Sequence, residues 1–273
     1  PTEVVGELQA YAKELSVSGD VVDDFVVDLG RVSATTEFLV GMEKETLVEG
    51  PGFAILPPLP ALSSVHELRT ATYILTEALG NSVIQNAEGD KSVLVYDRDA
   101  SRKMADGQRY HQSHEGGSLH TDNVNVPDTW EYMFLTCLQP AFVGGENILV
   151  SVTSLHNRLL EVAPDALEIL ASDFYWEFRG FDRSAYYKAP ILFYNKFGDP
   201  CFRYLRDYME SAHNRLNKPL SRDQLWALDS LVALCELSDL QYRFTATRGE
   251  TLVCNDMHIM HGRTMFIDAA PCV

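Results

Sequence analysis

The sequence has no run of apolar residues as long as the roughly 20 that a membrane-spanning helix requires. It is also poor in basic side chains: 22 lysines and arginines stand against 39 aspartates and glutamates, which gives a formal charge of −17. Binding to a phosphate backbone or to anionic lipid needs clustered lysine and arginine. The sequence therefore argues against nucleic acid and membrane partners.

Cysteine is scarce as well. The five cysteines are widely spaced and include no Cys-x-x-Cys pair, so neither a disulfide framework nor a thiolate zinc site is indicated. The opening residues Pro1, Thr2 and Glu3 are polar and acidic, unlike a signal peptide. We expect reduced thiols in a cytoplasmic protein.

What the sequence does contain is 46% hydrophobic residues over 273 positions, enough for a sizeable core. Apolar residues at helical spacing predict helices over 4–15, 63–81, 151–171 with a break at Pro164, 201–216 and 221–237. Short β-rich runs predict strands within 50–60, 91–99, 130–140, 146–151, 242–256 and 258–266. Strands gather in the middle and at the end, which predicts an α+β fold with a mainly β core and helices outside it.

The stretch SLHTDN, residues 118–123, sets an imidazole and a carboxylate two positions apart. In a strand, side chains at i and i+2 point to one face, so His120 and Asp122 can converge on one ion. His261 is the preferred third ligand, although His111, His114 and His258 are alternatives. Two imidazoles and one carboxylate on one face of an octahedron leave three positions open, as in non-haem Fe(II) oxygenases. The competing interpretation is a polar surface turn.

Several segments together carry a resemblance to a known family. They are LHTDN, WEYMFLTCLQPAFVGGENILVS, GETLVCNDMHIMHGRTMF and, earlier in the chain, GPGFAILPPLP and LGNSVIQNAEGDKSVLVYDRD. Their order and spacing resemble the taurine dioxygenase and clavaminate synthase-like family of Fe(II)/2-oxoglutarate oxygenases. The resemblance implies a double-stranded β-helix, or jelly roll, with flanking helices, and a single oxygenase domain over residues 1–273. It also implies that His120, Asp122 and His261 are the iron ligands.

Three positions depart from the family pattern. Asn147 stands where the family has a threonine that contacts the distal carboxylate of 2-oxoglutarate, and the usual Asp-Asn pair is inverted as Asn255-Asp256. The family arginine that binds the same carboxylate would fall beyond Val273. Either a C-terminal strand is missing from the sequence or Arg263 takes over this role. The alternative for Arg263 is a structural ion pair.

The resemblance implies a dioxygenase that uses Fe(II), 2-oxoglutarate and O₂ to oxidise an unactivated C–H bond, with release of succinate and CO₂. The retained carboxylate at Asp122 favours hydroxylation, desaturation or ring closure over halogenation. The expected partner is a small polar molecule, an amino acid or natural-product intermediate, and a homodimer is left open. Predicted substrate contacts are Tyr110, His111, Ser113, Asn123, Asp256 and His258. Asp256 and His258 could instead orient the metal ligands.

Two alternatives come from other functional classes. A divalent-metal hydrolase or isomerase could use the same three ligands without consuming 2-oxoglutarate. A non-catalytic jelly-roll binding protein would need no metal at all.

Overall fold

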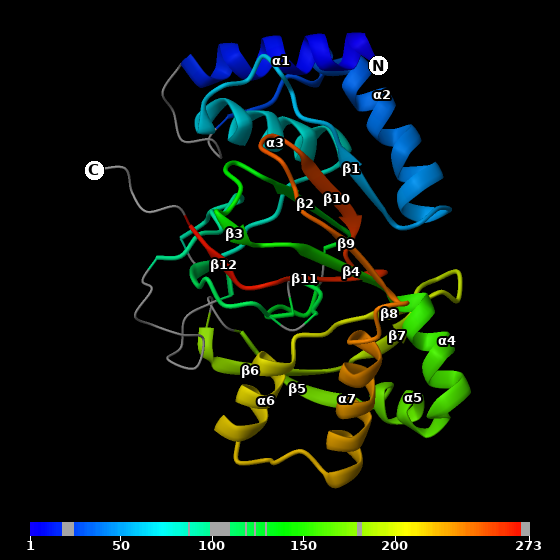
Figure 1. The fold of residues 1–273 in the computed structure, drawn as a ribbon. Helices are drawn as coiled ribbons and strands as arrows, with labels where there is room; N and C mark the ends of the chain where they lie inside the picture. Colours follow the sequence, from blue (N-terminus) through cyan, green and yellow to red (C-terminus); the bar gives the residue numbers. More distant parts are fainter. Residues whose placement is uncertain are drawn as a thin grey trace. The chain divides into compact units, whose positions relative to one another are not determined.

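Figure 1 shows the fold in a computed structural model, which describes residues 1–17, 25–86, 88–98, 110–117, 119–122, 124–128, 130–178 and 182–268. The chain forms two compact units. One comprises residues 1–95, 132–141 and 246–255, and the other comprises residues 96–131, 142–245 and 256–273. Both units contain helices and sheets, so the predicted α+β class is confirmed at that level.

The first unit combines helices with a three-stranded antiparallel sheet. Its helices are α1 (Thr2–Val17), η2 (Leu29–Val32), α2 (Ser33–Met42), the π-helical η3 (Glu43–Val48) and α3 (Val65–Leu79). Its strands β1 (Phe53–Leu56), β10 (Thr251–Asn255) and β2 (Tyr132–Thr136) lie in the order β1-β10-β2. Helix α3 begins where the sequence predicts, because Ser64 and Glu67 form a reciprocal capping box. Leu39, Ile74 and Val253 are fully buried in the core of this unit.

The second unit contains the remaining elements. Its helices are η5 (Tyr110–Gln112), α4 (Val152–Val162), α5 (Pro164–Leu170), α6 (Arg206–Arg215) and α7 (Arg222–Cys235). Its strands are β3 (Val143–Gly144), β4 (Asn147–Ser151), β5 (Asp173–Phe178), β6 (Asp182–Pro190), β7 (Leu192–Tyr194), β8 (Pro200–Phe202), β9 (Gln241–Phe244), β11 (Ile259–Arg263) and β12 (Phe266–Ile267). Its three-stranded antiparallel sheet has the order β11-β4-β9, and the other strands pair as β12-β3, β5-β6 and β7-β8.

One core cluster joins the elements of the second unit. Phe174 and Trp176 on β5 and Leu155 on α4 are fully buried in it, and Met260 on β11 packs into the same cluster. Because Met260 faces this core, its neighbours His261 and Ile259 on β11 project to the opposite face of the strand. The alternation along β11 therefore directs the His261 side chain away from this core, on a strand that is mostly buried.

One strand prediction is wrong. Residues 91–98 form no strand in the structure, although they include Val93, Val95 and Tyr96, which favour strands. Among the described residues, the amides of Tyr96 and Arg98 bond to the carbonyls of His111 and Gln112, and these bonds make no strand. A β-favourable composition needs a partner strand before it forms a sheet.

Within the described part of the chain, none of the helices has the length and apolar character needed to cross a bilayer.

Candidate metal centre

Two backbone hydrogen bonds bring the segment around His120 against β11. The amide of His120 donates to the carbonyl of His261 over 2.9 Å, and the amide of His261 donates back over 2.8 Å. This isolated antiparallel bridge joins residues 141 positions apart in the sequence. It places the two imidazole rings with centroids 4.5 Å apart and planes inclined by 50°. Of the predicted third ligands, the structure brings His261 to His120.

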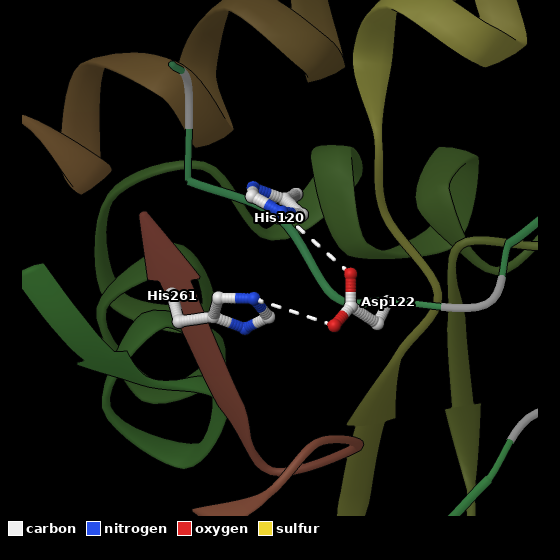
Figure 2. Close-up of side chains that lie close together, drawn as sticks. All are labelled: His120, Asp122 and His261. Carbon is white, nitrogen blue, oxygen red and sulfur yellow. Dashed lines mark ion pairs between the residues drawn. The ribbon is translucent and has the colours of Figure 1, made fainter. Parts of the chain in front are cut away.

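The carboxylate of Asp122 faces both rings (Figure 2). Its Oδ1 lies 3.8 Å from Nε2 of His120, and its Oδ2 lies 3.7 Å from Nε2 of His261. The imidazole side chains are buried, whereas the Asp122 side chain is 38% exposed. The three groups thus converge on a point that remains open on the carboxylate side.

The intervening Thr121 bonds to Tyr204, although the segment forms only an isolated bridge at His120 and not the expected strand. Its hydroxyl oxygen accepts a hydrogen bond from the amide of Tyr204 over 2.9 Å. Its own amide donates to the carbonyl of Tyr204 over 2.8 Å. Thr121 is only 2% exposed, so this pair of bonds fixes the backbone between the two candidate ligands.

The donor set fits a single metal ion. Bonds from a metal to nitrogen or oxygen are about 2.0–2.2 Å long, so one ion can join donor atoms up to roughly 4.2 Å apart. The two separations between imidazole nitrogens and Asp122 oxygens fall within that reach. Among the described residues, His120, Asp122 and His261 form a group that could hold an ion. Two imidazoles and one carboxylate with open positions are the donor set of non-haem iron sites.

Asp256 lies behind the group and is only 1% exposed. Its Oδ1 is 3.4 Å from Nδ1 of His261, and its Oδ2 accepts a hydrogen bond from the amide of Asp122 over 2.8 Å. A carboxylate at Nδ1 fixes the tautomer of a metal-binding histidine and leaves Nε2 for the ion. The contacts of Asp256 therefore suit the orienting role that the sequence left open beside substrate binding.

Burial and neighbouring charges together raise the pKa of both Asp256 and His261. Burial raises the pKa of Asp256 to about 6, although the hydrogen bond with His261 works in the opposite direction. Burial alone would lower the pKa of His261, but the charge of Asp122 and the bond to Asp256 outweigh it, so the pKa of His261 is raised. A cation bound here would displace protons, so its affinity would increase with pH.

The two predicted contacts to 2-oxoglutarate lie opposite each other. Asn147 begins β4 and pairs with Arg263 at the end of β11. The guanidinium of Arg263 donates from Nη1 to the carbonyl of Glu115 and from Nη2 to the carbonyl of Ser113. These two acceptors are main-chain oxygens.

The predicted substrate contacts are less uniform. His111 lies in η5. Ser113 is completely buried, and its hydroxyl oxygen accepts a hydrogen bond from the amide of Glu115. Nε2 of His258 is 3.7 Å from Sγ of Cys201, and burial lowers the pKa of His258. The backbone of Tyr110 belongs to η5, whereas its side chain and the whole of Asn123 lie outside the described residues. As substrate contacts, all of these positions and Asp256 remain predictions.

Two residues that contact the chain after Asp122 were not predicted from the sequence. The hydroxyl of Tyr187 on β6 donates to the carbonyls of Val124 and Val126, at 2.6 and 3.1 Å. The guanidinium of Arg203 lies 5.4 Å from the Tyr187 ring centroid and donates to the carbonyl of Pro127. Together they hold the chain that follows Asp122. Contacts across more than 60 residues leave no periodic signal in a single sequence.

Comparison with sequence families and curated proteins gives matches over most of the chain. The family model described as "Taurine catabolism dioxygenase TauD, TfdA family" matches residues 26–271. FR-33289 synthase of Streptomyces rubellomurinus is 26% identical over 250 residues, which are 89% of this chain and 72% of the relative. The taurine hydroxylase-like protein SAT17 of Stachybotrys chartarum is 25% identical over 191 residues, 67% of this chain but only 47% of its own length.

Solved structures with a similar fold include two oxygenases. Asparagine oxygenase in complex with Fe(II), 3-hydroxyasparagine and succinate has a TM-score of 0.65 and 16% identity, covering 100% of this chain and 88% of that protein. The non-haem iron oxygenase OrfP in complex with Fe and α-ketoglutaric acid has a TM-score of 0.61 and 16% identity, covering 99% and 87%. At these identities the likeness concerns the fold alone.

Proposed function

Because the chain belongs to the TauD, TfdA family of dioxygenases, we propose that it is an Fe(II)- and 2-oxoglutarate-dependent oxygenase of a small polar substrate. The reaction oxidises an unactivated C–H bond and releases succinate and CO₂. The observation that carries the proposal is the convergence of two buried imidazoles and one carboxylate within the family-matched region.

In this proposal His120, Asp122 and His261 bind the metal through Nε2, a carboxylate oxygen and Nε2. The bound iron and 2-oxoglutarate supply the activation of O₂ that abstraction of a hydrogen atom from carbon requires. The chain holds the ligands on one side, which keeps three coordination positions open. Asp256 keeps the Nδ1 proton of His261 in place, so that Nε2 presents its lone pair to the metal.

The substrate we propose is an amino acid or a similar zwitterion. Support comes from the bound molecules of the two structural neighbours, which are 3-hydroxyasparagine in asparagine oxygenase and hydroxylated arginine in OrfP. The polar segment that contains His111 is the proposed source of substrate contacts, and His258 is a second one. Asn147 remains the proposed contact to the distal carboxylate of 2-oxoglutarate.

We further propose that the two units work as one oxygenase domain with a jelly-roll core. The family match runs through both units, which supports a shared function. Each unit contains one antiparallel three-stranded sheet.

The experiment is a succinate-release assay under air with Fe(II), 2-oxoglutarate and each of the common amino acids in turn. We expect at least one amino acid to raise succinate release well above the substrate-free rate, and Asp122→Ala to abolish the increase. Mass spectrometry of the product then separates gain of one oxygen atom from loss of two hydrogen atoms, which would indicate desaturation or ring closure. No consumption of 2-oxoglutarate with any amino acid would contradict the proposal and favour a metal hydrolase, an isomerase or a binding protein.

A further inference from the structure

The guanidinium of Arg263 has an unusual set of acceptors for an arginine beside a metal centre. Nη1 donates to the carbonyl of Glu115 over 2.8 Å, and Nη2 donates to the carbonyl of Ser113 over 2.7 Å. The group also stacks over Phe266, with Cζ 4.6 Å from the ring centroid. Both terminal nitrogens are therefore engaged with one short stretch of main chain.

That stretch already lies against β11 and the residues that follow it. The amide of Gly117 donates to the carbonyl of Arg263, and the amide of Phe266 donates to the carbonyl of His114. Gly116 packs so closely that a Cβ there would lie 2.6 Å from the amide nitrogen of Met265. Residues 113–117 thus run beside residues 263–266 with few backbone bonds between them.

Arg263 supplies bonds that this irregular ladder lacks. Ser113 is completely buried, so its carbonyl would lose a needed partner without the guanidinium. The planar fork of arginine is suited to two acceptors side by side, here the carbonyls of Ser113 and Glu115. With Nη1 and Nη2 both bonded to these carbonyls, an end-on pair of bonds from the same two nitrogens to a carboxylate would compete with them.

The segment leads directly to the metal centre. Residues 113–117 are three positions before His120, whose backbone pairs with His261 on the strand that carries Arg263. Freeing this segment would therefore loosen the chain before His120, while the two backbone bonds between His120 and His261 keep the candidate ligands together. The same segment contains or adjoins the proposed substrate contacts His111 and Ser113.

We propose that Arg263 is a positioning residue, which locks residues 113–117 onto β11, and that it does not bind the distal carboxylate of 2-oxoglutarate. The first part depends only on the described contacts. The second part rests on the proposed function, since it concerns a co-substrate of that reaction.

Amide hydrogen exchange of the metal-free protein tests the first part without any ligand. Arg263→Met keeps most of the aliphatic part of the side chain and removes the hydrogen bonds to Ser113 and Glu115. Arg263→Lys can still donate one of them. The matched control is Arg158→Met, which removes an exposed arginine on α4. We expect exchange in peptides covering 113–117 to become about tenfold faster or more in Arg263→Met, intermediate in Arg263→Lys and unchanged in the control. Wild-type exchange in Arg263→Met would overturn the proposal.

Anaerobic absorption titration of the Fe(II)-loaded variants with 2-oxoglutarate tests the second part. Thermal unfolding first checks that each variant is folded, and Arg263→Lys serves if Arg263→Met is not. We expect the apparent Kd for 2-oxoglutarate to stay within about threefold of wild type, because no ion pair to the co-substrate is lost. A Kd raised about tenfold or more, with unchanged exchange at 113–117, would assign Arg263 to the carboxylate.

The two readouts separate failure of this inference from failure of the proposed function. If the wild-type protein binds Fe(II) but no 2-oxoglutarate, the oxygenase proposal fails, while the exchange data still decide whether Arg263 holds the segment.

Discussion

Replacing Asp256 by asparagine isolates the contribution of the carboxylate behind the metal ligands. The buried side chain contacts Nδ1 of His261 at 3.4 Å and accepts the amide of Asp122 at 2.8 Å. Asparagine has nearly the same shape and can keep one of these contacts, but it lacks the negative charge. The variant should therefore fold with its ligands close to their places and bind metal less well.

The size of the loss follows from the role of the carboxylate. Removing the partner that orients a metal-binding histidine typically costs about 10–100-fold in metal affinity, which is about 1.4–2.7 kcal/mol. Anaerobic titration of Fe(II) against a competing chelator measures it, with Asp239→Asn at an exposed carboxylate as the control. An unchanged affinity in Asp256→Asn would refute the orienting role.

The same variant gives a signed prediction for the metal-free protein. Because burial raises the pKa of Asp256 to about 6, the folded chain holds this proton more tightly than the unfolded chain does. Stability is therefore lost as pH rises from about 4 to about 6, by no more than about 3 kcal/mol. Asparagine does not titrate, so urea unfolding of the metal-free protein should show a smaller loss of stability between about pH 4 and pH 6 in Asp256→Asn than in wild type. An equal loss in both proteins would contradict the raised pKa.

Three further predictions concern close packing, a hydrogen bond and a titrating side chain elsewhere in the second unit. Gly116→Ala should speed amide exchange across residues 113–117, because its Cβ would collide with the amide nitrogen of Met265; normal exchange would contradict this close packing. Tyr187→Phe should lower the free energy of unfolding by about 1–3 kcal/mol in urea titrations, since two carbonyls lose their donor, whereas Tyr175→Phe, which loses an exposed bond, should cost less. Burial lowers the pKa of His213, so the free energy of unfolding should decrease as the pH falls below about 6.5. His213→Gln should make this decrease smaller. An equal decrease in variant and wild type would refute the prediction.

The family and the general fold class could be predicted from the sequence because their signals are local and ordered. Alternation around His120 and the pattern at His261 each belong to one short stretch, and their order along the chain matches the family. The helix that begins after Ser64 and the one that begins after Ser221 were predicted for the same reason, since a capping box spans only four residues. These predictions are confirmed.

Features that depend on distant partners could not be predicted in the same way. Residues 91–98 have a strand-like composition but form no strand, and the pairing of Trp176 on β5 with Tyr187 on β6 was not predicted. The sequence also could not predict that Arg263 bonds to the carbonyls of Ser113 and Glu115. An arginine offers the same five donors to a carboxylate or to carbonyls, so only its surroundings decide which acceptors it meets.

The most direct test of the central claim is anaerobic Fe(II) titration of the metal-free wild type, Asp122→Ala and His261→Ala, with His156→Ala as a surface control. The structure predicts one ion per chain in wild type and control, and affinities lowered about 100-fold or more in both ligand variants. Wild-type affinity in His261→Ala would contradict the claim, because the two imidazoles and the carboxylate would then not share one ion.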